Sequence, residues 1–248
     1  MRRVLATNPR SGTHYLKMLI SAALDSDPVE KTYAKARDLD AMLSAAPANR
    51  LVYGHFQFRE FSPILDTRRF SDLRLIVLTR HPFDRMISQC ALDKARGGHI
   101  PSTASTAQQL AREMLLGHWD NRPWESGYKV ADYAAVHNYY LGELVSNWVE
   151  FRRCLMVRFE HLVARPIEVL AECLDHLEIR TSIHDCRRAV SAINFESLSS
   201  GRRPGEVDVS SHYRCGIPGE WRGVFSPEDI ESVRPKYVAA FARAGYLL

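Results

Sequence analysis

Cysteine is scarce in this chain and never occurs in the paired spacing of a metal site. The 248 residues include an odd number, five: Cys90, Cys154, Cys173, Cys186 and Cys215. The absence of a CxxC pair argues against a zinc site, and the scatter argues against a disulfide framework. Such cysteine usage is typical of a reducing compartment, so we expect a cytoplasmic protein without a bound metal.

Long apolar runs are lacking as well. The apolar stretch after Met1-Arg2-Arg3 has only four residues before Asn8-Pro9. That is too short for a signal peptide, and no later segment approaches a membrane span, so we expect no membrane partner. The hydrophobic share of 46% is enough for one sizeable core. With no repeat and no clear linker, we expect one domain over 1–248, although the length also admits two small ones.

Neither sign of charge dominates. The 33 Lys and Arg residues exceed the 29 Asp and Glu residues by only four, and they form no long basic run. A nucleic-acid partner is therefore not expected, and a compact anionic ligand fits the charge equally well. No feature of the sequence decides the oligomeric state.

Short apolar runs alternate with helical patterns. Four runs predict buried strands: Val4–Thr7, Leu51–Tyr53, Leu75–Thr79 and Leu155–Phe159. Amphipathic stripes that begin at Leu16, Val136 and Ile167 predict helices, and Ser226-Pro227 predicts a helix start with Gly245 as its stop. This alternation predicts an α/β fold with a mainly parallel central sheet flanked by helices.

Three stretches break the alternation: 25–50, 95–130 and 199–220. The first is polar and mixed, the second holds a Ser/Thr tract, and the third holds glycine and proline between arginine-bearing segments. We expect acceptor or lid loops here, since binding residues are often carried on loops, although long loops can also be without function.

The segment Pro9-Arg10-Ser11-Gly12-Thr13-His14-Tyr15 follows the first predicted strand after Asn8 and leads into a predicted helix. A tight turn at a helix N-terminus directs several N–H groups at one point and favours an anion there. The nucleotide pattern GxxxxGK[ST] is absent, which disfavours an ordinary kinase or GTPase. The alternative is a routine turn in which Ser11 and Thr13 cap the helix.

A second anion site is predicted after Leu75–Thr79. Arg80 stands at the carboxyl end of that strand, and Pro82 suits the first turn of a helix that carries Ser88. Ligands of open α/β sheets gather at the carboxyl ends of strands, so Arg80 and Ser88 are candidates to share one phosphate. The alternative is that Arg80 pairs with a local acid such as Asp84.

These segments together resemble the sulfotransferases that use 3′-phosphoadenosine 5′-phosphosulfate (PAPS). Pro9–Tyr15 is similar to the family's PKSGTTW loop, and Arg80 with Ser88 matches its arginine and serine, eight residues apart. Arg158-Phe159-Glu160-His161-Leu162 resembles RYEDL, and Arg214 followed by Cys215–Arg222 resembles RKGxxGDWK. The four motifs occur in the family's order. The resemblance implies a P-loop-like strand–loop–helix for the phosphosulfate and a metal-independent transfer from PAPS that leaves 3′-phosphoadenosine 5′-phosphate (PAP).

The resemblance also implies the catalytic pair. Arg10 occupies the position of the family's catalytic lysine and is expected to stabilise charge on the leaving phosphate, because arginine does not readily give up a proton. His55 follows Leu51–Gly54, where the family's catalytic histidine lies, and is the expected base. His14 is the rival, although its place in the donor loop turns it toward the phosphates.

Further residues are assigned to the donor by the same resemblance. Those expected to bind it are Arg10, Ser11, Gly12, Thr13, His14, Tyr15, Arg80, Ser88, Phe159, Phe195, Arg214, Cys215 and Gly216. Tyr15 and Phe195 are equally interpretable as core residues. Phe159 lacks the hydroxyl of the family's tyrosine, and Cys215 lacks the charge of its lysine, so we expect a weaker donor site than in the family.

Aromatic residues near the loops suggest the acceptor site: Phe56, Phe58, Trp119 and Trp124. They suit a small alcohol, phenol or glycoside, as in secondary metabolism, but they are equally compatible with a small core. Two other functions stay open. One is a nucleotide-dependent phosphotransferase with an atypical loop, and the other is an inactive module that binds anions or glycans.

Overall fold

The computed structural model describes residues 2–24, 31–33, 39–45, 51–55, 72–95, 104–116 and 154–248. The chain forms two compact units, each built from two separate stretches. The first unit comprises Met1–Arg80 and Asn147–Leu198, and the second comprises His81–Ser146 and Ser199–Leu248. Each unit has a hydrophobic core of its own.

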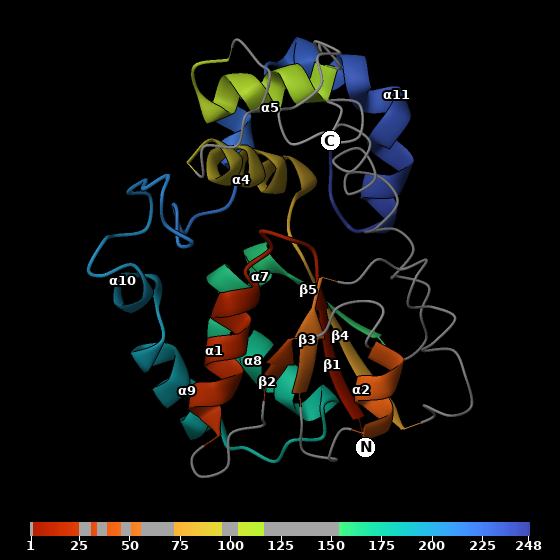
Figure 1. Ribbon diagram of the computed structural model, residues 1–248, viewed down its shortest axis with the longest axis vertical. Coiled ribbons are helices and arrows are strands. Elements are labelled where there is room, and N and C mark those ends of the chain that lie inside the picture. The colour runs from red at the N-terminus through yellow and green to blue at the C-terminus, as the bar shows by residue number, and fades with distance from the viewer. Residues whose placement is uncertain are drawn as a thin grey trace. The chain divides into compact units, whose positions relative to one another are not determined.

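The described strands of the first unit form a five-stranded sheet in which every pairing is parallel, with the order β2-β3-β1-β4-β5 (Figure 1). Its strands are β1 Arg2–Thr7, β2 Lys31–Tyr33, β3 Leu51–Gly54, β4 Leu73–Thr79 and β5 Cys154–Arg158. The four predicted strands are confirmed, except that Phe159 begins a helix instead of ending β5. The predicted α/β class with a parallel sheet is thereby confirmed.

Helices accompany this sheet in the described part of the first unit. They are α1 Thr13–Ala23, α2 Leu39–Ala45, α7 Phe159–Ala164, α8 Pro166–His176, α9 Ile183–Ala192 and α10 Phe195–Leu198. The predicted stripe of α1 is buried, with Leu16 and Leu19 fully inaccessible. Buried side chains of α1, α8 and α9 join those of the strands in one core cluster. Helices α8 and α9 therefore help to hold α1 against the sheet.

Two segments expected to be loops contain regular structure, and this corrects the sequence interpretation. Strand β2 and helix α2 lie within 25–50, and helix α5, Ala107–Leu116, lies within 95–130. Strand β2 has only three residues, and Leu43 is a fully buried apolar side chain in a short helix, so the apolar periodicity was too brief to detect. The Ser/Thr tract lies just before α5, and for this reason the sequence there was interpreted as a loop.

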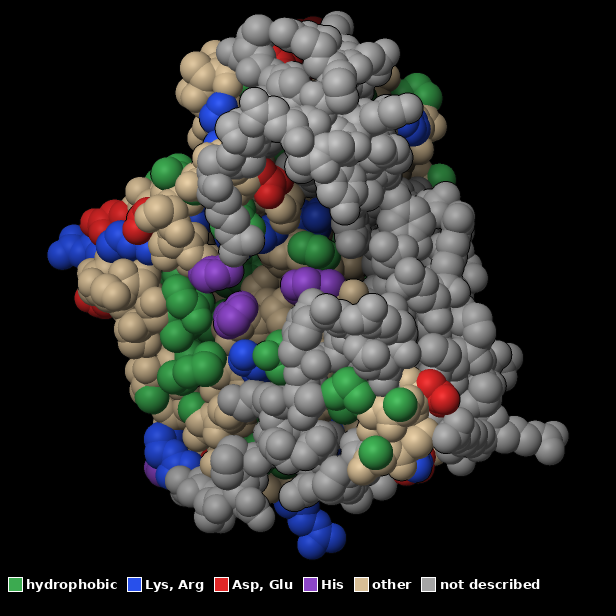
Figure 2. Space-filling model, viewed as in Figure 1, with side chains coloured by type: hydrophobic (Ala, Val, Ile, Leu, Met, Phe, Trp, Pro, Cys, Tyr) green, Lys and Arg blue, Asp and Glu red, His purple; other side chains and the backbone are tan. Residues whose placement is uncertain are grey.

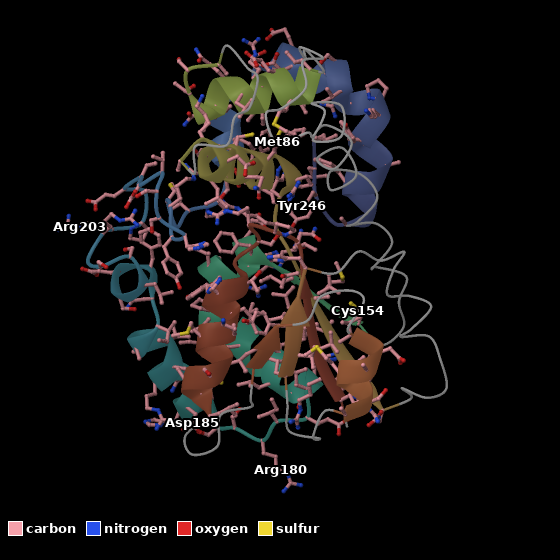
Figure 3. All side chains as sticks on the ribbon, viewed as in Figure 1. Met86, Cys154, Arg180, Asp185, Arg203 and Tyr246 are labelled. Atoms are coloured by element: carbon pink, nitrogen blue, oxygen red, sulfur yellow. The ribbon has the colours of Figure 1, made fainter. Side chains whose placement is uncertain are left out.

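In the described part of the second unit, three helices and one 3₁₀ turn pack around an aromatic core. These are α4 Pro82–Ala95, α5, η3 Glu220–Gly223 and α11 Pro227–Arg243. Figure 3 labels Met86 of α4 and Tyr246, which follows α11, and both belong to the core cluster. Between α10 and η3 the chain forms turns, which Arg202 ties together by donating to the carbonyl oxygens of Tyr213 and Arg214 at 2.7 and 3.0 Å.

The predicted ends of the last helix are confirmed. At its start the N–H of Asp229 donates to Ser226 Oγ at 3.2 Å, and the N–H of Ser226 donates to the Asp229 carboxylate at 2.9 Å, a reciprocal cap. At its end Gly245 has φ 76°, and the N–H of Tyr246 donates to the Phe241 carbonyl at 2.8 Å. That pattern is the left-handed stop that glycine favours.

Candidate functional site

The turn between β1 and α1 reverses the chain within a few residues. The N–H of Ser11 donates to the Asn8 carbonyl at 3.3 Å, and the N–H of Asn8 donates to the Leu78 carbonyl of β4 at 3.4 Å. Arg10 and Gly12 both have left-handed backbones, with φ 67° and 92°. Gly12 is the N-cap of α1 and makes no side-chain cap bond. The first N–H groups of a helix have no acceptor within it, so the turn presents donors to an anion.

Glycine is required at position 12 because an aromatic ring lies against it. A Cβ atom there would lie 2.5 Å from Cδ2 of Phe159. Beside it, Ser11 is fully buried, and its Oγ has no hydrogen-bond partner among the described residues. A buried hydroxyl without a protein partner is uncommon, and it fits a turn whose acceptor is a bound anion. The residues of the turn therefore suit a phosphate or sulfate group.

Arg80 joins this turn from the neighbouring strand. It follows β4, is 8% exposed, and its guanidinium lies 4.8 Å from the centre of the Phe159 ring. Its Nη1 also donates to the Arg10 carbonyl at 3.4 Å. The structure thus brings together three elements that the sequence separates widely: the β1–α1 turn, the end of β4 and the first residue of α7.

His55 lies at the carboxyl end of β3, beside the end of β1. Its Nδ1 is 3.0 Å from Thr7 Oγ1 and 3.2 Å from the Thr7 carbonyl oxygen. The parallel register, in which Ala6 faces Gly54, sets this proximity. Histidine side chains are among those at the surface in Figure 2, and His55 and His14 are both exposed. His14 lies in the first turn of α1, within the anion turn itself.

Two aromatic residues assigned to the donor, Tyr15 and Phe195, lie in different surroundings. Tyr15 packs against the core cluster of the first unit, and burial raises the pKa of its hydroxyl. That placement supports the interpretation of Tyr15 as a core residue. Phe195 is half-buried at the first position of α10, which Asn194 caps by accepting from the N–H of Ser197 at 2.9 Å.

The remaining donor candidates belong to the second unit. Ser88 is buried in α4, at the predicted place in that helix. Arg214 is buried and paired with Glu220: its Nη1 donates to Oε1 at 3.0 Å, and its Nη2 donates to Oε2. Cys215 is also buried, and Gly216 has a left-handed backbone with φ 74°.

A buried carboxylate that the sequence interpretation did not assign holds the segment after Gly216. Asp84 of α4 is fully buried and accepts from the N–H groups of Gly219 and Trp221, the latter at 3.0 Å. The suggested alternative partner of Arg80 therefore has backbone partners of its own. Next to it His81 stacks on Trp221, with ring centres 4.7 Å apart. Trp221 thus has a packing role. The role of Asp84 as an acceptor for these N–H groups was not predicted, because both partners lie more than a hundred residues away.

Some candidates lie outside the described residues: Phe56, Phe58, Trp119 and Trp124. Their assignment to the acceptor stays a prediction. Within the described part of the chain, no group of three His, Cys, Asp or Glu side chains gathers as a metal site. No helix in that part is long and apolar enough to cross a membrane.

Comparisons with known proteins give one consistent fold. The family model of the sulfotransferase domain matches residues 2–245 and so spans both units. No curated protein sequence matches the chain. The mouse sulfotransferase SULT7A1 in complex with PAP is similar in structure, with a TM-score of 0.63 and 16% identity over 97% of this chain and 84% of that one. A retinol dehydratase bound to androsterone and PAP follows, with a TM-score of 0.59 and 16% identity over 95% and 80%.

Proposed function

Because this chain belongs to the sulfotransferase domain family, we propose that it transfers the sulfuryl group of PAPS to a hydroxyl group of a small molecule. The observation that carries the proposal is the β1–α1 turn, where the buried Ser11 hydroxyl and the close contact of Gly12 with Phe159 suit a bound anion. Structures similar in fold hold PAP together with androsterone or retinol, which supports a small acceptor. An alcohol, phenol or glycoside is the class we propose.

In the proposed transfer, Arg10 stabilises the leaving group and His55 accepts the proton, and both residues belong to the first unit. The acceptor oxygen attacks sulfur, the bond between sulfur and the bridging oxygen breaks, and the electron pair stays on the 5′-phosphate of PAP. Arg10 and the N–H groups of the turn stabilise that charge, and one such preorganised donor is worth ~3–4 kcal/mol in comparable sites. The acceptor proton passes to His55, because His14 lies within the anion turn on the donor's side.

The 3′-phosphate is assigned from the sequence pattern to Arg80, Ser88, Arg214 and the amide of Gly216. Arg214 can serve while it keeps Glu220, since a guanidinium has five N–H donors and the carboxylate accepts from only two. Its Nε has no hydrogen-bond partner among the described residues. The adenine ring is assigned to Phe195 and Tyr15, of which Tyr15 is the weaker candidate because it packs in the core.

A nucleotide titration tests the donor. Thermal unfolding with PAP, ADP and AMP should show a clear preference for PAP, because a ligand at 100 times its Kd adds ~2.7 kcal/mol to the free energy of unfolding. Equal stabilisation by AMP would remove the 3′-phosphate site from the proposal. Turnover in EDTA separates the rival phosphotransferase, which needs a metal: loss of activity there would favour the rival.

Substitution of His55 tests the base. His55→Ala should reduce kcat by ~10²–10⁴ while PAP binds as before, since the ring is proposed to act on the acceptor's proton. His184→Ala is the matched control, because His184 is exposed on α9. Unchanged turnover in His55→Ala would exclude His55 as the base. If no hydroxyl acceptor is sulfated by the wild-type protein, the inactive binding module becomes the better description.

A further inference from the structure

We infer that Thr7 is a positioning residue that holds the His55 ring in one tautomer, with the proton on Nδ1 and the lone pair on Nε2. The inference deepens the proposed function and rests on it, because a base must present a lone pair to the acceptor. Thr7 is the last residue of β1, 2% exposed, and it contacts His55 through two different oxygen atoms.

The carbonyl oxygen of Thr7 determines which ring nitrogen carries the proton. It lies 3.2 Å from Nδ1 of His55. A carbonyl oxygen can only accept a hydrogen bond, so the contact is favourable only when Nδ1 is the donor. A neutral imidazole has one N–H and one lone pair, and a proton on Nδ1 leaves the lone pair on Nε2.

The hydroxyl group of Thr7 acts in the same direction. Its single proton is donated to the Gly54 carbonyl at 3.2 Å, so Oγ1 meets its other neighbours with lone pairs. One of them is Thr13 Oγ1, which donates at 2.9 Å, and the other is Nδ1 of His55 at 3.0 Å. Both oxygens of Thr7 therefore accept from the same N–H.

The arrangement has the function of the aspartate in a Ser-His-Asp triad, which holds the histidine in its working tautomer. Here neutral oxygens replace the carboxylate, so orientation is supplied without a second charge. Because Thr13 is the first residue of α1, one hydroxyl of the anion turn is part of the same chain of hydrogen bonds. The orientation of the base is thereby tied to the turn that we assign to the donor.

The direct test is the ¹⁵N spectrum of the histidine rings in the wild-type protein. At a pH where the ring is neutral, two-bond couplings should show His55 with a protonated Nδ1 and an unprotonated Nε2. Comparison with His55→Gln identifies the signals. A protonated Nε2 would overturn the inference, whatever the variants do.

Substitutions of Thr7 give the functional test. Thr7→Val removes the hydroxyl and keeps the carbonyl, so we expect kcat to fall about fivefold, the effect of one net hydrogen bond. The share of the Nε2-protonated tautomer should rise, and Thr7→Ser should restore both kcat and the wild-type tautomer. Thr79→Val is the control, because Thr79 is equally buried at the end of β4 and donates to the Val157 carbonyl at 3.4 Å.

The outcomes separate this inference from the proposed function. If Thr7→Val keeps the wild-type kcat and tautomer, the Thr7 hydroxyl does not position the ring; a wild-type ring protonated on Nε2 would exclude the Thr7 carbonyl as well. If Thr79→Val changes the tautomer equally, the effect is one of general packing and the inference fails. Activity retained by His55→Ala would refute the proposed base, even where the spectrum shows Nδ1 protonated.

Discussion

Replacement of Gly12 by alanine should destabilise the protein for two separable reasons. The backbone at position 12 has φ 92°, and a left-handed conformation costs an alanine roughly 1–2 kcal/mol. The new methyl group would also lie 2.5 Å from Cδ2 and 2.9 Å from Cε2 of Phe159. Carbon atoms prefer a separation of about 3.5–4.0 Å, and such overpacking costs typically ~1–3 kcal/mol. The expected loss is therefore ~2–5 kcal/mol.

A movement of the Phe159 ring would also affect Arg80. It is 8% exposed, and the guanidinium of Arg80 lies over its face at 4.8 Å. A ring displaced by the methyl group would shift Arg80 as well. We therefore expect Gly12→Ala to weaken PAP binding in addition to lowering the free energy of unfolding.

Urea unfolding and calorimetry with PAP measure the two effects. Gly201→Ala is the matched control, because Gly201 has φ 94° and nothing lies within 4 Å of the position that the new methyl group would occupy. It should show the backbone cost alone, so the difference between the two variants is the cost of the contact with Phe159. In a double-mutant cycle, Phe159→Ala should recover that part. Equal losses in Gly12→Ala and Gly201→Ala would refute the argument.

Two further predictions concern other parts of the chain. Asp84→Asn replaces one acceptor oxygen by an amide that faces a backbone N–H, so we expect a loss of ~1–3 kcal/mol in urea unfolding; an unchanged midpoint would contradict the role of Asp84. Burial, followed by the charges of Arg158 and Arg165, lowers the pKa of His161, whose Nε2 lies 2.6 Å from Arg158 Nη2. The unfolded chain then binds more protons, so the free energy of unfolding should rise with pH from the lowered pKa to the ordinary value of ~6.5. Urea titrations from acid to neutral pH should show that rise to be smaller in His161→Gln; an identical slope would contradict it.

Much of the fold could be predicted because its helices and strands carry signals in their own local sequence. The buried strands are short apolar runs, and the last helix carries its own start at Ser226 and its own stop at Gly245. Strand β2 and helix α2 could not be predicted in this way. A three-residue edge strand is stabilised by its pairing with β3, and that pairing leaves no periodic pattern in the sequence.

In the candidate site, too, the features set by neighbouring residues were predictable and the long-range contacts were not. The β1–α1 turn was predictable because consecutive residues determine the backbone of a tight turn and the donors that it presents. The histidine at the end of β3 could be proposed as a base only from a resemblance. Its partner Thr7, 48 residues away, was not predictable from any local pattern.

By itself, the sequence determined the strand–turn–helix at Pro9–Tyr15 and the family to which the chain belongs. Only the tertiary structure decided that Phe159 closes on Gly12 and that Thr7 meets His55. The physical reason is that a turn depends on neighbours along the chain, whereas these contacts depend on the order of strands in the sheet. Because β1 lies between β3 and β4, and β5 pairs with β4, residues far apart in sequence meet at the carboxyl ends of these strands.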